Sequence, residues 1–178
     1  MPIDDLKNII GKRSFPARLM ALDVGEKTIG VAISDREQTL STPLRTVKRT
    51  KFSEDIKALK ALIREYEIHG FIIGWPVNMD GSRGPQCDRV RSFADEMARS
   101  LSERFEDPWI ALWDERLSTE TVHNLMDESV DTCKNLRKSK SGGKKRVEVK
   151  GVTDMLAAHV ILQGALEFIN GNSSHHGL

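Results

Sequence analysis

A continuous apolar segment, Phe71–Trp75, lies between two segments in which apolar residues recur at helical spacing. A strand without polar alternation is typical of the interior of a parallel sheet, where helices cover both faces. The preceding helix is expected from about Ser53 to His69. The following helix is expected from Pro85, a favourable first helical residue, to about Phe105. The segment therefore predicts layers of helix and sheet.

Three shorter strands precede this segment, over residues 19–22, 28–34 and about 44–47. Their short links predict an antiparallel meander. A further strand is expected over 109–113, and a last helix over 153–169. The predicted fold class is α/β, with a five-stranded mixed sheet of three antiparallel strands and then two parallel strands, and with helices on both faces.

The length of 178 residues favours a single domain, and 39% hydrophobic residues are enough for one core. We expect that domain over residues 17–170, after an N-terminal arm at 1–16. A flexible basic loop is predicted over 129–150. Residues 171–178 are expected to form a disordered tail.

Charge and cysteine content exclude several classes of protein. The net charge is +1, so any affinity for nucleic acid must come from local clusters of basic residues. Cys87 and Cys133 form no CxxC pair, which gives no indication of a zinc site or a disulfide framework. No apolar run approaches the roughly 20 residues that cross a bilayer. The N-terminus also lacks the apolar core of a signal peptide. A cytoplasmic protein without a membrane partner is expected.

Acidic residues occur at the edges of three apolar runs: Asp23, Asp114 with Glu115, and Asp154. A charge in such a place is costly unless something compensates it. Each also has a simpler explanation. Asp23 suits a turn, and Asp114 or Glu115 could pair with Arg116 at a strand end. Strand alternation allows only one of that adjacent pair to enter a single site.

Asp154 is the most informative of these acids. It lies four residues before Ala158, on the alanine-rich face of the last predicted helix. A favourable interaction with the helix dipole explains an acid near the helix start, but not an acid that faces inward. Three acids that a fold could bring together predict a divalent-metal site, which is typical of phosphoryl chemistry.

A basic segment immediately precedes Asp154. Residues 134–150 contain eight Lys or Arg and one Glu. A solvated loop is the simpler interpretation, but a mobile basic loop beside the acids favours contact with a phosphate backbone. The residues predicted to bind nucleic acid are Lys138, Lys140, Lys144, Lys145 and Arg146.

A turn-rich loop follows the Phe71–Trp75 strand and contains Asn78 and Asp80. These two residues, with Arg116, are candidates to line the cleft. A turn signature explains Asn78 and Asp80 equally well.

Four motifs, ALDVGEKTIGVAISD, GWPVNMDGSRG, DERLST and VTDMLAAHVILQ, together resemble the YqgF family. This family comprises the pre-16S rRNA nucleases, also described as Holliday-junction-resolvase-like, within the RNase H-like superfamily. The motifs occur in the family's order across most of the chain. Trp75 stands where the family typically has Leu.

The resemblance implies an RNase H-like fold and a nuclease whose acids hold Mg²⁺ or Mn²⁺, as two ions. It assigns metal-binding and catalytic roles to Asp23, to Asp114 or Glu115, and to Asp154, and strand direction alone favours Asp114 over Glu115. The implied mechanism is two-metal hydrolysis with ions roughly 4 Å apart, bridged by Asp23.

The function expected from this resemblance is metal-dependent cleavage of structured RNA, at the 5′ end of pre-16S rRNA during ribosome biogenesis. One alternative is a Holliday junction resolvase that acts on branched DNA. Another is a non-catalytic RNA-binding or transcription-associated factor. The expected assembly is a monomer or a weak homodimer.

Overall fold

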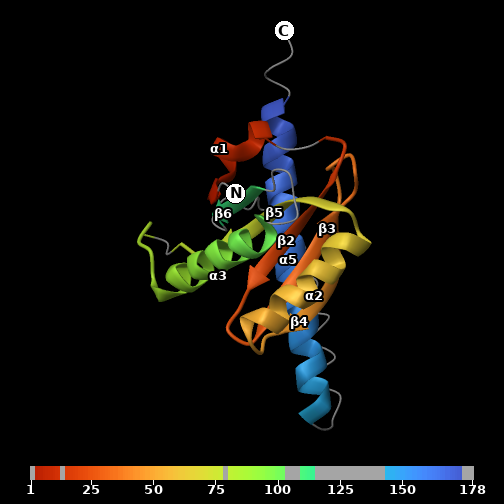
Figure 1. Ribbon diagram of the computed structural model, residues 1–178, viewed down its shortest axis with the longest axis vertical. Coiled ribbons are helices and arrows are strands. Elements are labelled where there is room, and N and C mark those ends of the chain that lie inside the picture. Colours follow the sequence, from red (N-terminus) through yellow and green to blue (C-terminus); the bar gives the residue numbers. More distant parts are fainter. Residues whose placement is uncertain (1–2, 13–14, 78–79, 103–108, 115–142, 174–178) are drawn as a thin grey trace.

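The computed structural model describes residues 3–12, 15–77, 80–102, 109–114 and 143–173, with the backbone alone for 143–151 (Figure 1). These residues form a six-stranded mixed sheet in the order β1-β6-β5-β2-β3-β4. The strands are β1 (Ile3–Asp5), β2 (Arg18–Val24), β3 (Thr28–Ser34), β4 (Ser41–Lys48), β5 (Ile68–Trp75) and β6 (Trp109–Asp114). The helices are α1 (Leu6–Ile9), the short 3₁₀ helix η1 (Ile10–Lys12), α2 (Phe52–Glu65), α3 (Pro85–Ser102) and α5 (Gly143–Ser173).

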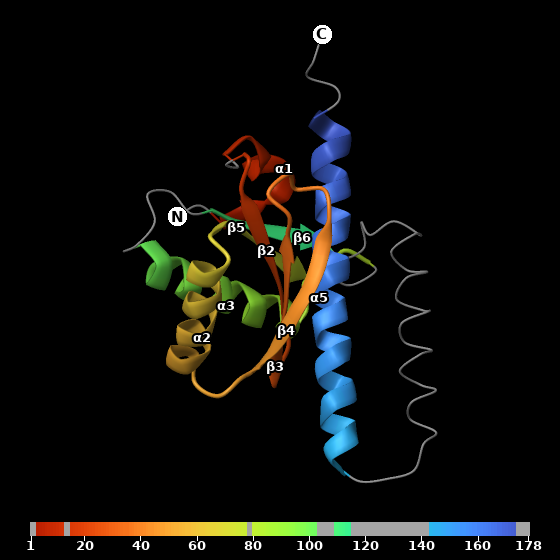
Figure 2. The same ribbon diagram turned by 90° about the vertical axis from the view of Figure 1, so that its right-hand side faces the viewer.

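Helices cover both faces of the sheet, as predicted (Figure 2). One hydrophobic cluster joins one face to α2 and α3, and includes Leu22, Phe71 and Leu112. A second cluster joins the opposite face to α5 and α1, and includes Ala21 and Ile72. Residues that alternate along one strand therefore belong to different clusters.

The predicted topology is confirmed for the strands that were predicted. β2, β3 and β4 pair antiparallel, whereas β5 pairs parallel with both β2 and β6. The crossovers run through α2 and α3. Central β5 is almost wholly buried, which explains its continuous apolar sequence.

The sheet has one strand more than the five predicted. β1 pairs in parallel with β6, with Ile3 opposite Ile110. Within the predicted arm, Leu6 and Ile9 are buried against the α5 face. The sequence Ile-Asp-Asp has no strand-like alternation and does not by itself predict a strand. It forms β1 because the free edge of β6 supplies a partner.

α5 begins at Gly143, well before the predicted start near residue 153. Residues 143–150 of the predicted loop are therefore helical, and 129–142 lie outside the described residues. Lys, Arg and Glu are good helix formers, and a helix already anchored on a sheet extends without a new nucleation step. The helix also continues through Gly171 to Ser173, into the predicted tail.

The segment Val152–Asn172 is long and apolar enough to cross a membrane by length and composition alone. Its apolar side chains instead pack on the sheet, where Ala158, Leu162 and Ala165 are fully buried. A core helix passes the same test, so this segment is no indication of a membrane protein.

Candidate metal centre

Asp23 is the next-to-last residue of β2 and pairs with Gly30 of β3. Leu19 and Ala21 belong to the cluster under α5, so alternation places the Asp23 side chain on the same face. Val24 belongs to the opposite cluster. The carboxylate of Asp23 therefore lies where the sheet meets α5.

α5 crosses the sheet in direct contact with Gly30. A Cβ atom at Gly30 would lie 1.8 Å from the carbonyl oxygen of Asp154. Only glycine allows this approach, because any other residue would collide with the helix backbone. Since Gly30 is also the partner of Asp23, this contact brings Asp154 to Asp23.

The two acids have unfavourable surroundings without a cation. Burial, and then the negative charge of Asp154, raise the pKa of Asp23 from 3.8 to about 6. The Oδ2 atom of Asp154 is buried and has no hydrogen-bond partner within the described structure. A buried carboxylate oxygen without a partner is costly. In the described part of the chain, two carboxylates thus lie close together, and one of their oxygens lacks a hydrogen-bond partner.

This arrangement fits a divalent cation. Mg²⁺ and Mn²⁺ prefer carboxylate oxygens, and a cation would satisfy Asp154 and favour the ionised form of Asp23. In the part of the chain that the structure describes, no third His, Cys, Asp or Glu completes a cluster with them. Two of the predicted acids therefore come together.

Asp114, the last residue of β6, is not brought to this pair. Leu112 belongs to the cluster under α2 and α3, whereas Trp113 belongs to the cluster under α5. Alternation therefore directs Asp114 toward the face opposite Asp23. It lines a cavity of about 260 Å³ together with Trp75 and Arg83. Its metal-binding role stays a prediction that the direction of β6 does not favour.

The remaining predicted site residues are only partly described. Asp80 is exposed, and its Oδ1 accepts a hydrogen bond from the Ser82 N–H at 2.8 Å, in keeping with a turn. Lys144, Lys145 and Arg146 lie near the start of α5, where the backbone alone is described. Five others lie outside the described residues: Asn78, Glu115, Arg116, Lys138 and Lys140.

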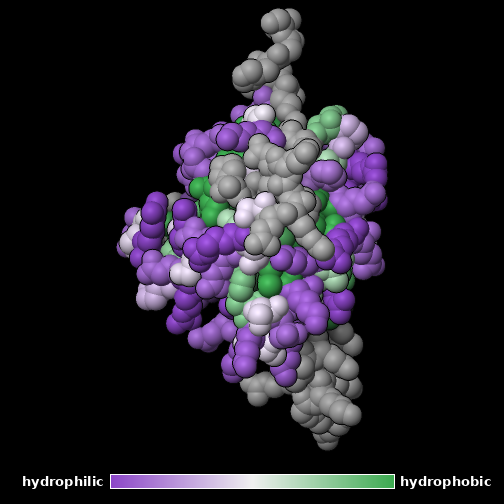
Figure 3. Space-filling model, in the orientation of Figure 1, coloured by the Kyte–Doolittle hydropathy of each residue, from purple (hydrophilic) through white to green (hydrophobic). Residues whose placement is uncertain are grey.

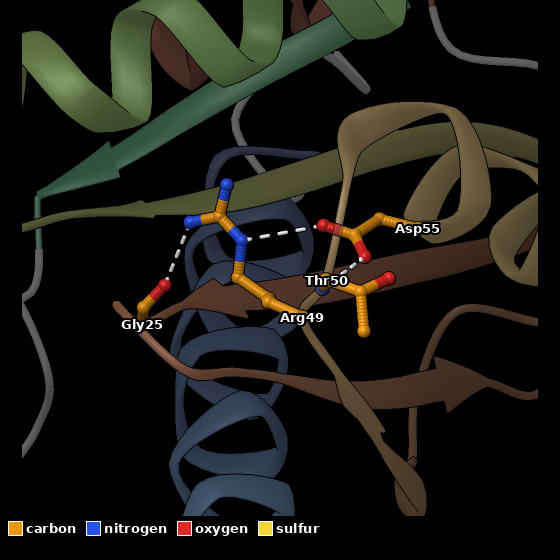
Figure 4. A network of polar contacts seen from close by, with 4 residues as sticks. All are labelled: Gly25, Arg49, Thr50 and Asp55. Carbon is orange, nitrogen blue, oxygen red and sulfur yellow. Dashed lines mark hydrogen bonds and ion pairs between the residues drawn. The ribbon is translucent and has the colours of Figure 1, made fainter.

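A partly buried polar network at the turn between β2 and β3 was not predicted from the sequence (Figure 4). Arg49 Nη1 donates to the carbonyl oxygen of Gly25 at 2.8 Å, and Arg49 Nε lies 3.4 Å from Oδ2 of Asp55. The Thr50 N–H donates to Oδ1 of Asp55 at 3.0 Å. Asp55 lies in the first turn of α2, and its side chain is 2% exposed. No spacing signal in the sequence marks Arg49 as its partner.

The surface over α2 and α3 is mainly hydrophilic, with small apolar areas between charged side chains (Figure 3). Basic and acidic residues are interspersed here, as in the Arg89–Glu26 and Arg91–Asp95 ion pairs. The described basic residues of these two ion pairs are therefore each offset by an acid beside them.

Comparison with known sequences assigns residues 17–168 to one family, described as RuvX, Holliday junction resolvase. A protein of Paramagnetospirillum magneticum is 41% identical over 171 residues, which cover 96% of this chain and 99% of the relative. One of Ruegeria pomeroyi is 46% identical over 149 residues, which cover 84% and 85%. Both relatives are assigned by name as pre-16S rRNA nucleases.

Two solved structures share the fold. The yeast mitochondrial Holliday junction resolvase Ydc2 aligns with a TM-score of 0.53 and 13% identity, over 96% of this chain and 86% of that chain. T. thermophilus RuvC in complex with a Holliday junction substrate aligns with a TM-score of 0.51 and 7% identity, over 88% and 96%. These likenesses show the RNase H-like fold.

Proposed function

The chain belongs to the RuvX family of Holliday junction resolvases, and from this premise we propose that it is a metal-dependent nuclease. It hydrolyses phosphodiester bonds and processes the 5′ end of pre-16S rRNA. The names of relatives at 41% and 46% identity support this RNA substrate. The proposed setting is the cytoplasm, as a monomer or weak homodimer.

The observation that carries the proposal is the meeting of Asp23 and Asp154. Two acids from distant parts of the chain approach each other at a glycine contact, although their charges repel. One carboxylate oxygen is buried without a partner. A structural role alone would favour residues that satisfy one another, whereas a cation site accounts for both features.

We propose Glu115 as the third acid, ahead of Asp114. Asp114 follows the alternation of Leu112, away from α5. Asp114 is therefore a poor match for the face of Asp23, which leaves Glu115, outside the described residues, as the other acid that the resemblance implies. This supports Glu115 in the open choice between the two acids.

Asp23, Glu115 and Asp154 would hold two Mg²⁺ or Mn²⁺ ions. When bound, such ions activate water and stabilise the leaving oxygen of an in-line displacement. Asp23 must be ionised to bind a cation, and at neutral pH a carboxyl group with a pKa of about 6 is mostly ionised. Lys138, Lys140, Lys144, Lys145 and Arg146 would contact the phosphate backbone. Asn78, Asp80 and Arg116 would line the cleft.

The test is cleavage of a pre-16S rRNA fragment that carries its 5′ extension, with Mg²⁺ or Mn²⁺ and with EDTA. We expect metal-dependent cleavage by the wild-type protein. Asp23→Asn and Asp154→Asn should each reduce it by at least about 100-fold, since each removes a charge that binds metal. Asp95→Asn, at a surface ion pair of α3, is the matched control and should keep full activity.

Cleavage that survives EDTA or Asp23→Asn would contradict the proposal. A wild-type protein that binds RNA but no Mn²⁺ would instead support a non-catalytic RNA-binding factor.

Holliday junction cleavage is a second candidate. The family description and the two solved structures of the same fold are named for this activity. A four-way DNA junction should therefore be tested beside the RNA. Symmetric cuts in two strands, made by a dimer, would favour the resolvase.

A further inference from the structure

The turn between β2 and β3 begins directly after the strand that carries Asp23. Its backbone is held by an internal hydrogen bond, from the Gly25 N–H to the carbonyl oxygen of Thr28 at 2.9 Å. It is also held from outside by Arg49. The Arg49 N–H donates to the carbonyl oxygen of Lys27 at 2.9 Å, and Arg49 Nη1 donates to that of Gly25 at 2.8 Å. One residue thus fixes both sides of the turn.

Arg49 is itself fixed by its surroundings. Its Nε lies 3.4 Å from buried Asp55, and its guanidinium lies over the ring of Phe93 at 5.5 Å from the centroid. Asp55 also accepts the Thr50 N–H, which orients the carboxylate. Figure 4 shows Arg49 extending between Gly25 and Asp55. The side chain therefore has a single favoured position, directed at the turn.

Stability alone does not account for this network. Replacing a buried ion pair by apolar residues is often neutral or stabilising, so such a pair is weak evidence for a stabilising role. The exposed pair between Arg89 and Glu26 meets the same turn from α3, at 3.0 Å. An exposed pair contributes at most about 1 kcal/mol. The contact of Arg49 with the Gly25 carbonyl is therefore more specific than the contact of Arg89 with Glu26.

We propose that Arg49, oriented by Asp55, is a positioning residue that fixes the β2–β3 turn and thereby the Asp23 carboxylate for metal binding. This inference rests on the proposed metal-dependent function. Gly25 is two residues from Asp23, so a shift of the turn moves the carboxylate relative to Asp154. A misplacement of about 1 Å can cost roughly 100-fold in a catalytic site.

The test uses the full chain carrying Arg49→Met together with Asp55→Asn. This double substitution removes both charges and leaves an acceptor for the Thr50 N–H, so no charge stays buried without a partner. We expect a folded protein whose affinity for Mn²⁺, measured by calorimetry, falls about 10- to 100-fold, as for other residues that orient metal ligands. The Mn²⁺ affinity of Arg49→Lys should lie between those of this variant and the wild type, because a lysine ammonium group keeps the charge but cannot make the forked hydrogen bonds of a guanidinium.

Hydrogen exchange in the metal-free protein provides a second readout. The Gly25 amide should exchange faster in the double variant than in the wild type, because the Gly25 carbonyl loses its hydrogen bond from the Arg49 side chain. Arg36→Met removes an exposed arginine that pairs with Glu67, and should change neither measurement.

Wild-type Mn²⁺ affinity in the double variant would overturn the inference, as would unchanged exchange at Gly25. A wild-type protein that binds no Mn²⁺ would overturn the proposed function and, with it, the metal-positioning role. Exchange would then still show whether Arg49 holds the turn.

Discussion

In the metal-free protein, burial and the negative charge of Asp154 disfavour the ionised form of the Asp23 carboxyl group. The raised pKa of Asp23 means that the folded state prefers its protonated form. The stabilising effect of that proton is complete below the unfolded pKa of 3.8, and is lost as the pH rises toward about 6. Above this range the ionised carboxylate destabilises the metal-free fold.

Asp23→Asn should therefore stabilise the metal-free protein at neutral pH, although we expect the same substitution to reduce cleavage. A shift of the pKa from 3.8 to about 6 corresponds to at most about 3 kcal/mol. Urea denaturation in EDTA at pH 7.5 should show a higher free energy of unfolding for the variant. The difference should shrink at pH 4.5. Asp95→Asn should show no such pH-dependent gain, and equal stability of wild type and Asp23→Asn at pH 7.5 would contradict the assignment.

The choice between Asp114 and Glu115 can be tested in the same way. Glu115→Gln should weaken Mn²⁺ binding by at least 10-fold, because a metal ligand loses its charge. Asp114→Asn should leave Mn²⁺ affinity within about 2-fold, because β6 directs this side chain away from Asp23. Calorimetric titration of the two variants side by side measures both. The reverse order of effects would assign the role to Asp114.

At the scale of elements, α5 depends on the absence of a side chain at Gly30. Gly30→Ala would place a methyl group 1.8 Å from the Asp154 carbonyl oxygen, so the helix must move. We expect a loss of about 1–3 kcal/mol or more in the free energy of unfolding. Mn²⁺ affinity should fall too, since Asp154 moves with the helix.

Gly171→Ala, in α5, is the control for Gly30→Ala. A Cβ there meets nothing within 4 Å, and alanine favours the helix. Urea denaturation should show unchanged or slightly higher stability. A Gly30→Ala protein as stable as this control would mean that the close approach is not required.

The elements that could be predicted from the sequence are those that form because of their own residues. The apolar run at Phe71–Trp75 and the favourable first residue Pro85 identify β5 and α3 without knowledge of the rest. β1 could not be predicted, because Ile3–Asp5 becomes a strand only beside the edge of β6. The early start of α5 has a similar cause, since packing farther along the helix supports its first turns.

At the scale of the whole molecule, a net charge of +1 leaves nucleic-acid affinity to local clusters. Lys144→Gln with Lys145→Gln should lower the salt dependence of RNA binding by up to about 1.4 in log–log slope, at about 0.7 per phosphate contact. Filter binding over a range of KCl concentrations measures this slope. The matched pair Lys51→Gln and Lys57→Gln, exposed near and on α2, should leave the slope unchanged. Equal slopes for the two double variants would mean that Lys144 and Lys145 of α5 do not contact the RNA backbone.

The candidate site could be predicted only in part, because it depends on the arrangement of the whole molecule. An inward-facing Asp154 follows from helical spacing, and strand alternation limits Asp114 and Glu115 to one place. That Asp23 and Asp154 meet depends on the close contact at Gly30, which spacing does not reveal. Arg49 and Asp55 are six residues apart, but the contact of Arg49 with Gly25 depends on the pairing of β4 with β3, which spacing does not reveal either.

The two acids that meet at Gly30 lie near opposite ends of the chain, and this has a consequence for synthesis. A ribosome makes the N-terminal part first, so the meander of β2, β3 and β4 emerges long before α5. Until α5 emerges, the sheet lacks the helix that covers one face, and Asp23 lacks Asp154. Such distant contacts raise the contact order and slow folding. A nascent chain therefore lacks the assembled pair of acids, and the proposed site can meet RNA near the ribosome only after translation of α5.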